Sequence, residues 1–292
     1  MQCPSCPSIM QMEDIRVEGR SGSLGELLYC VVVNGQNGKE YRIPTEAELT
    51  ASRLSSEGLT EIYDRLPVPI PEARIEPAST RSISCHEYGL NQYRKLMTPR
   101  QTAFIGCIAH QIRAARQRIG DSNSDELAEA IAAFLSGVLD KCLDYGNTLA
   151  SWYTQNEQIS HLFNRYSLPM KWDFAEAAPF GGASGSWDSM LDSVSRSVET
   201  TMGAFSSSSA GPDIRSQSVL DGLGDAKFDA VVTDPPYYQA VSYADLSDFF
   251  YVWLRLVYAD IHDPFREELT SKDREIVQHI RTDKDRAQEK QK

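Results

Sequence analysis

The chain has 292 residues, which is enough to bury one large hydrophobic core or two modest ones. Its formal net charge of −12 argues against broad binding of nucleic-acid phosphates, so a DNA-binding function requires a local basic face. No apolar run is long enough to cross a bilayer, and the first residues lack the regions of a signal peptide. We therefore expect a cytoplasmic protein with no membrane partner.

A Cys-x-x-Cys pair lies at the start of the chain. Cys3 and Cys6 have the spacing of one zinc-binding knuckle, and two such knuckles complete a tetrahedral thiolate site. Because a second knuckle is absent, the other ligands would have to come from Cys30, Cys85 and His86. The alternative is a half site whose partner cysteines precede the first residue or have been lost, with Cys30 as a small core residue.

A hairpin and a helix are predicted next. The apolar segment 27–33 and the segment 40–43, Glu-Tyr-Arg-Ile, are joined by a Gly/Asn turn, which is typical of two paired strands. Residues 45–66 have a helical pattern, which the prolines of 67–71 end. The prolines and small polar residues that continue to about residue 84 indicate an exposed connector.

Two long helices are expected to follow as an antiparallel pair. The run Thr98-Pro-Arg-Gln101 combines an N-cap, a proline at the first helical position and the glutamine of a capping box. The second helix begins near Ser124, after the short turn 120–124. Its apolar stripe is predicted to face the core: Leu127, Ile131, Phe134, Leu135, Val138, Leu139 and Cys142.

Basic residues are densest in and just before the first of these two helices. They are candidates for the local basic face that DNA binding requires, although a solvated helix face explains them as well. They are Arg94, Lys95, Arg100, Arg113, Arg116 and Arg118.

A glycine-rich loop precedes a third helix, predicted over 187–200. Glycines let the backbone approach a ligand closely, so Phe180, Gly181, Gly182 and Gly185 are candidates for cofactor contact. Alternatively, the loop covers an active site without touching a cofactor. The serine- and glycine-rich stretch 202–217 has the composition of a mobile linker.

The strongest chemical pattern follows this linker. Residues 228–232 form an apolar run with β-branched residues, which predicts a buried strand of a parallel sheet. Asp234-Pro235-Pro236-Tyr237 would end that strand rigidly, because proline cannot donate to a strand ladder and restricts the residue before it. Ligands of open α/β sheets bind at this carboxyl edge.

These four residues fit the methylation of an exocyclic amino group on a base that has left the stack. The Asp234 carboxylate and the Pro235 carbonyl would accept the two amino protons and free the nitrogen lone pair. Tyr237 would stack on the base, a contact worth about 1–3 kcal/mol. An aspartate at the first position favours adenine N6 over cytosine N4.

A broad apolar stripe then predicts a helix over 242–257, followed by a charged tail over 271–292. Asp245 and Asp248 lie near the positive end of that helix. They either position a substrate or pair with the helix dipole.

With its neighbours, the Asp-Pro-Pro-Tyr motif resembles the bacterial and archaeal adenine-specific DNA methylases that contain an internal zinc ribbon. The resemblance covers most of residues 30–285 and rests on five segments: 39–46, 96–101, 168–187, 231–238 and 243–254. It implies S-adenosylmethionine as methyl donor and DNA as partner. It also implies a zinc ion with Cys3 and Cys6 as ligands. The resemblance also leaves room for partners from restriction or defence systems, whose identity it does not specify.

The glycine-rich loop is similar to the Pro-Phe-x-Gly-x-Gly turn with which this family holds S-adenosylmethionine, but position 184 is serine where glycine is expected. The family's own cofactor turn lies upstream of the zinc ribbon and would precede the first residue here. The resemblance thus implies an interior piece of the family's usual length.

The predicted fold is α/β, a partial Rossmann-like methyltransferase sheet with a largely helical insertion. We divide it into a zinc-ribbon-like β segment with its connector over 1–84, a helical region with the glycine loop over 85–200, a catalytic part over 201–270 and the tail. The expected function is DNA adenine N6-methyltransferase. The alternatives are a catalytically silent DNA-binding or assembly protein that keeps the fold, and a Pro-Pro-x-Tyr ligand for a WW-type module.

Overall fold

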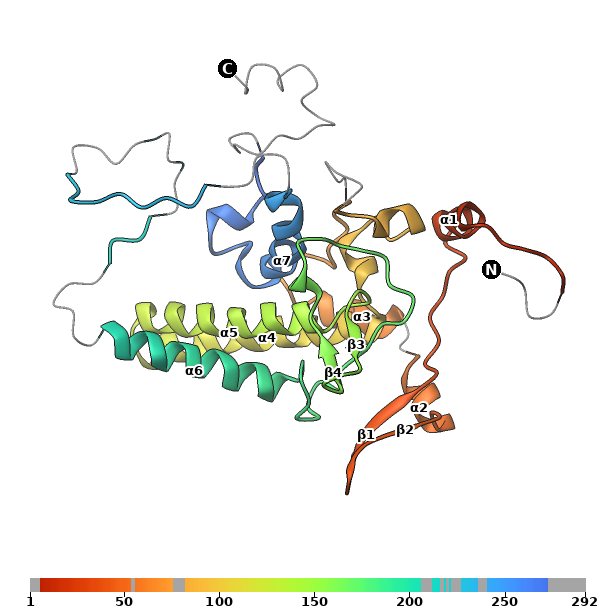
Figure 1. Cartoon of the computed structure of the whole chain (residues 1–292). Helices are drawn as coiled ribbons and strands as arrows, with labels where there is room; N and C mark the ends of the chain where they lie inside the picture. The colour runs from red at the N-terminus through yellow and green to blue at the C-terminus, as the bar shows by residue number, and fades with distance from the viewer. Residues whose placement is uncertain are drawn as a thin grey trace, which may run out of the picture.

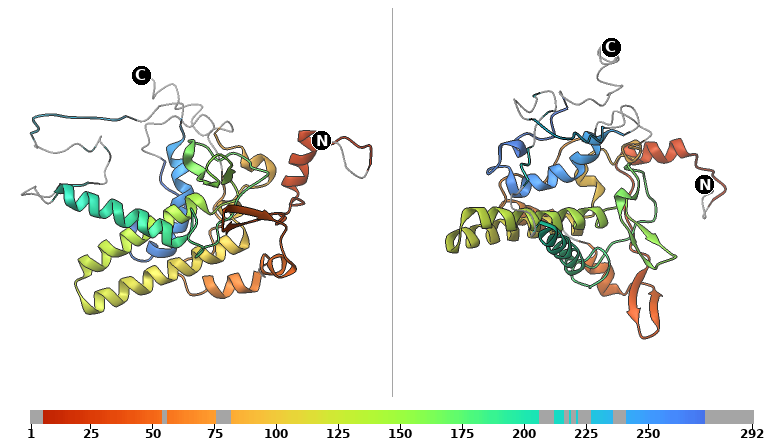
Figure 2. Two further views of the ribbon diagram at one scale, coloured as in Figure 1. Left: turned by 60° about the horizontal axis from the view of Figure 1, so that its bottom comes forward. Right: turned by 60° about the vertical axis from the view of Figure 1, so that its left-hand side comes forward.

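The computed structural model describes residues 6–53, 56–75, 82–205, 212–215, 218, 221, 227–235 and 241–272. These residues form a mixed α/β structure in which helices dominate (Figure 1). The antiparallel pair α4 (Pro99–Ser122) and α5 (Asp125–Tyr145) lies at its centre. Helix α7 (Tyr243–Tyr258) packs on one side of the pair and α6 (Trp187–Phe205) on the other (Figure 2).

Local capping interactions fix where the central helices begin. The Thr98 hydroxyl accepts a hydrogen bond from the Gln101 backbone N–H at 3.2 Å, and the Gln101 side chain accepts one from the Thr98 N–H at 2.8 Å. The Ser124 hydroxyl accepts from the Leu127 N–H at 3.3 Å. The predicted capping box and helix pair are therefore confirmed.

Helix α7 supplies much of the hydrophobic core. Phe249, Val252, Trp253, Leu256 and Val257 are fully buried, and they pack against α4 and α5. Burying a side chain of this size stabilises the fold by about 1.5–3 kcal/mol. The predicted helix and its apolar stripe are confirmed.

The apolar stripe predicted for α5 is partly wrong. Leu127 and Phe134 are 46% and 49% exposed, whereas Ala128, Ala132 and Ser136 are buried. The buried face of α5 therefore includes small side chains in its first half, alongside large ones such as Leu139 and Leu143 further on.

The helix predicted over 45–66 is two helices, α2 (Glu46–Ala51) and α3 (Ser56–Tyr63). The Ser52 hydroxyl donates to the Leu49 carbonyl at 2.7 Å just after the end of α2. Serines that bond to the backbone in this way compete with helix continuation. Four short 3-10 helices complete the helical elements of the described chain: η1 (Cys85–Tyr88), η2 (Tyr93–Leu96), η3 (Leu162–Asn164) and η5 (Asp263–Phe265).

The described residues hold two sheets, and each is a two-stranded antiparallel hairpin. Strands β1 (Val31–Gly35) and β2 (Gly38–Arg42) pair with Val31 opposite Arg42, which confirms the predicted hairpin. Strands β3 (Ser151–Tyr153) and β4 (Gln158–Ser160) were not predicted. The Rossmann-like sheet is therefore not confirmed.

The strand predicted over 228–232 is wrong. The segment has no regular secondary structure, and Phe228, Val231 and Val232 are 56%, 75% and 95% exposed. It runs outside the helical body in Figure 1. A strand needs a neighbour to pair its backbone groups. The described strands pair only with each other, as β1 with β2 and β3 with β4, and none of them pairs with residues 228–232.

Helix α1 (Met12–Arg20) docks on η1 through two glycines. A Cβ at Gly19 would overlap the Tyr88 carbonyl oxygen, and Gly89 has a φ of +86° beside the Gly19 carbonyl. The Arg16 guanidinium lies 5.5 Å from the centre of the Tyr88 ring and pairs with Glu87 at 3.0 Å. Docking thus depends on close backbone contact.

We predict that Gly19→Ala weakens this docking by about 1–3 kcal/mol, because the added methyl forces two backbones apart. The measurement is hydrogen exchange of the α1 amides, whose protection should fall. Gly25→Ala is the control, because a Cβ there would meet no described atom within 4 Å. Equal exchange in the two variants would contradict the prediction.

Of the helices described, none combines the length and apolar content that crossing a bilayer demands.

Candidate functional site

The first two residues of the predicted catalytic motif lie on the surface. Asp234 and Pro235 are both exposed, in the irregular segment 227–235 that precedes α7. Pro236 and Tyr237 lie outside the described residues. Solvent therefore reaches both of these residues.

Asp245 and Asp248 lie in the first two turns of α7 and are only 5% and 1% exposed. The Asp248 carboxylate accepts hydrogen bonds from the Thr270 N–H at 2.9 Å and the Thr270 hydroxyl at 2.6 Å. Lys272 Nζ lies 2.6 Å from its other oxygen. Asp248 therefore ties residues 270–272 to α7. This structural role differs from the two predicted ones, which were substrate positioning and pairing with the helix dipole. The Asp245 carbonyl accepts a hydrogen bond from the Tyr93 hydroxyl at 3.1 Å.

The glycine-rich loop packs against the end of α5. Gly185 has a φ of +89°, and a Cβ there would lie 2.9 Å from the Tyr145 Cβ. The Pro179 carbonyl accepts a hydrogen bond from the Trp187 N–H at 2.7 Å, and the Ser186 hydroxyl accepts one from the Ser189 N–H at 3.4 Å. These contacts lie at the start of α6 and supply partners for its first backbone N–H groups.

Phe180, Gly181 and Gly182 make contacts within the protein. The Phe180 ring is 69% exposed and meets the Phe104 ring edge-on at 6.0 Å. Gly181 donates its N–H to the Ala178 carbonyl at 3.1 Å, and Gly182 has a φ of +67°, so both serve the turn. The loop also lies on the opposite side of the helical body from residues 227–235 (Figure 1). The structure does not bring the loop to Asp234.

The predicted metal ligands are scattered. Cys3 lies outside the described residues and Cys6 is exposed. Cys85 is buried, and burial raises the pKa of its thiol to about 12, which disfavours the thiolate that binds zinc. His86 Nδ1 lies 2.8 Å from the Ile83 carbonyl oxygen. Over the described ranges, no three His, Cys, Asp or Glu side chains gather to hold a metal ion.

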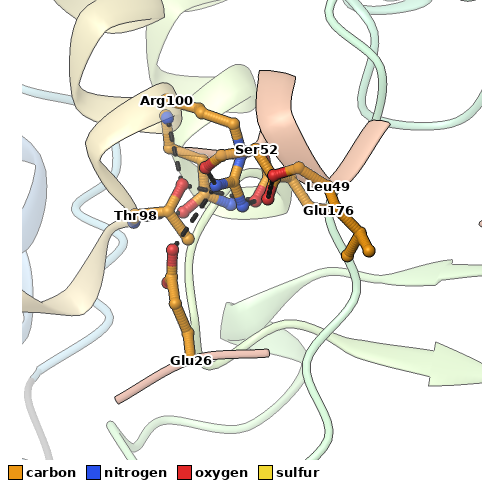
Figure 3. A network of polar contacts seen from close by, with 7 residues as sticks. Glu26, Leu49, Ser52, Thr98, Arg100 and Glu176 are labelled. Carbon is orange, nitrogen blue, oxygen red and sulfur yellow. Dashed lines mark hydrogen bonds and ion pairs between the residues drawn. The ribbon is translucent and has the colours of Figure 1, made fainter. Parts of the chain in front are cut away.

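The predicted basic face is largely neutralised by ion pairs. Arg100 Nη2 lies 2.8 Å from Glu176, its Nη1 lies 3.4 Å from Glu26, and it also binds the Ser52 carbonyl (Figure 3). The other pairs are Arg94 with Glu72, Arg113 with Asp260 and Arg116 with Glu129. DNA releases counterions when a free cation of the protein neutralises a phosphate. A guanidinium that is already paired with a carboxylate contributes little to this, so these four arginines do not form the expected face. Lys95 and Arg118 stay outside these pairs and bond to nearby backbone carbonyls.

A groove between α5 and the end of α7 was missed in the sequence. It has a volume of about 590 Å³, and Asp140 of α5 lines it together with Tyr258 and Phe265. Its sequence signature is a row of small residues on α5, but periodicity alone assigns such a row to core packing.

Comparisons with models of protein families, with curated proteins and with solved structures each return no match to this chain.

Proposed function

We propose that this chain acts as an S-adenosylmethionine-dependent methyltransferase on the N6 amino group of adenine in DNA. The observation that carries the proposal is the run Asp234-Pro-Pro-Tyr, which precedes the largely buried helix α7 in the sequence. In this proposal the Asp234 carboxylate and the Pro235 carbonyl accept hydrogen bonds from the amino group. Pro236 stiffens the turn and Tyr237 stacks on the base.

Two structural features support the roles of Asp234 and Pro235. Both are exposed, so an extruded base can reach them. The helix that follows in the sequence is anchored by fully buried side chains such as Phe249 and Trp253. Catalysis of this kind consists mainly of orienting the nitrogen toward the methyl group.

The second candidate is a catalytically silent assembly protein. It is favoured by the glycine loop, where the Pro179 carbonyl accepts a hydrogen bond from Trp187 of α6 and Gly181 donates its N–H to the Ala178 carbonyl. The paired arginines favour assembly over DNA binding within this alternative.

Asp234→Asn is expected to reduce methyl transfer by about 100-fold or more, because the amide has one acceptor oxygen in place of two and carries no charge. The measurement is transfer of labelled methyl from S-adenosylmethionine to unmethylated duplex and single-stranded DNA, with the products separated as N6-methyladenine and N4-methylcytosine. Asp229→Asn is the matched control, since Asp229 is an exposed aspartate of the same segment. Equal activity of both variants would remove Asp234 from the reaction.

Calorimetry with S-adenosylmethionine separates the two candidates. Saturable binding to the unaltered chain rules out the silent protein. Absence of both binding and methyl transfer rejects the enzyme as a property of this chain.

A further inference from the structure

The groove between α5 and α7 is open because one face of α5 carries small residues. Ala130, Ala133 and Gly137 follow at helical spacing along the groove. A Cβ at Gly137 would meet no described atom within 4 Å. Its volume of about 590 Å³ falls within the range of about 300–1,000 Å³ that is typical of small-molecule sites.

The opposite wall is apolar and aromatic. Leu254 and Tyr258 of α7 line it together with Phe265. The rings of Tyr258 and Phe265 are 5.2 Å apart, and the Tyr258 hydroxyl lies 2.9 Å from the Ser136 hydroxyl. This hydrogen bond fixes the Tyr258 ring, so the wall is preformed.

Two carboxylates line the groove, and their surroundings differ. Glu129 is neutralised, because Arg116 Nε lies 2.8 Å from one oxygen and His262 Nε2 lies 3.3 Å from the other. Oδ1 of Asp140 is buried, and no group among the residues described donates a hydrogen bond to it. Burial raises the pKa of this carboxyl to about 7. Asp140 as a whole is half-buried and lines the groove, so a donor that binds there can meet a carboxyl group that is costly to leave unpaired.

We propose that this groove binds a small organic amine, with its ammonium group on Asp140 and its apolar body against Leu254, Tyr258 and Phe265. The charge is complementary, because Asp140 is the carboxylate of the groove without a cation. The aromatic wall adds a favourable surface for the cation and for the apolar body. A chain with a net charge of −12 also attracts cations. This site is independent of the proposed methyl transfer.

The test uses benzylamine, phenethylamine and the neutral isostere benzyl alcohol, titrated at pH 8 and followed by calorimetry and NMR. We expect saturable binding of the amines, about tenfold or more tighter than that of the alcohol, as for a hydrogen bond to a charged group. Asp140→Asn should abolish this preference. Asp192→Asn on the exposed face of α6 is the control with the same loss of charge, and it should leave the preference unchanged.

A second variant distinguishes the groove from a nonspecific charge effect. Ala133→Leu fills the groove at an exposed position and keeps Asp140, so it should weaken binding of the amines and of the alcohol alike. The proposal is overturned if neither amine binds saturably, if amine and alcohol bind equally to the unaltered chain, or if Asp140→Asn keeps the preference while its thermal unfolding shows an intact fold.

Discussion

Asp248→Ala is expected to lower the free energy of unfolding by about 3 kcal/mol. The Asp248 side chain is 1% exposed, and its oxygens accept hydrogen bonds from the Thr270 N–H, the Thr270 hydroxyl and Lys272 Nζ. Removing the carboxylate leaves these donors without their acceptor. Because the Lys272 side chain is 28% exposed and can turn to water, we place the effect at the low end for a buried ion pair.

Urea unfolding of Asp248→Ala, Lys272→Met and the double variant measures this interaction. Lys272→Met leaves a buried carboxylate with Thr270 alone, so the double variant should be less destabilised than the sum of the single ones. Asp263→Ala is the control, because Asp263 is 83% exposed and pairs with Arg266 one turn away, which is worth about 0.5 kcal/mol or less. An effect of Asp248→Ala no larger than that of the control would contradict the assignment of Asp248 as an anchor.

The stability of the unaltered chain should fall between about pH 4 and pH 7 through Asp140. Burial raises the pKa of this carboxyl from its ordinary value of 3.8 to about 7. In the unfolded chain the group ionises near the ordinary value, whereas the folded protein holds the proton until about pH 7. The unfolded state therefore gains from ionisation first, and stability is lost as the pH rises through this window.

Each pKa unit corresponds to about 1.4 kcal/mol, so the loss from pH 4.5 to pH 8 is about 3 kcal/mol. Asp140→Asn removes the titrating group and should remove this loss, which is measured by urea unfolding at pH 4.5, 6 and 8. Glu48, whose hydrogen bonds to Arg42 and Thr45 lower its pKa to about 2, titrates below this window. Asp192→Asn should keep the pH dependence of the unaltered chain; the same slope in Asp140→Asn would show that Asp140 ionises normally.

Local interactions made several elements predictable from the sequence. Thr98 and Ser124 cap helices through hydrogen bonds that span three residues, and the β1–β2 hairpin closes over a short turn. The apolar stripe of α7 repeats at helical spacing. In each case the signal lies within a few residues or turns of the chain, so the amino-acid sequence alone predicts the element.

Long-range contacts decided the rest. Residues 228–232 have the composition of a strand, but a strand depends on a neighbour that composition does not specify. The ion pair of Arg100 with Glu176 joins residues 76 positions apart and converts an expected DNA contact into an internal one. The buried face of α5 and the missing partner of Asp140 likewise depend on how α4 and α7 pack.

The sequence by itself determined where helices start, the hairpin turn and the Asp-Pro-Pro-Tyr motif. Only the tertiary structure decided that Asp248 anchors residues 270–272, that the Pro179 carbonyl accepts a hydrogen bond from Trp187 of α6, and that no described residue donates a hydrogen bond to Oδ1 of Asp140. The physical reason is that burial and charge pairing are set by atoms brought together from distant parts of the chain, whereas capping and periodicity are set within a few turns.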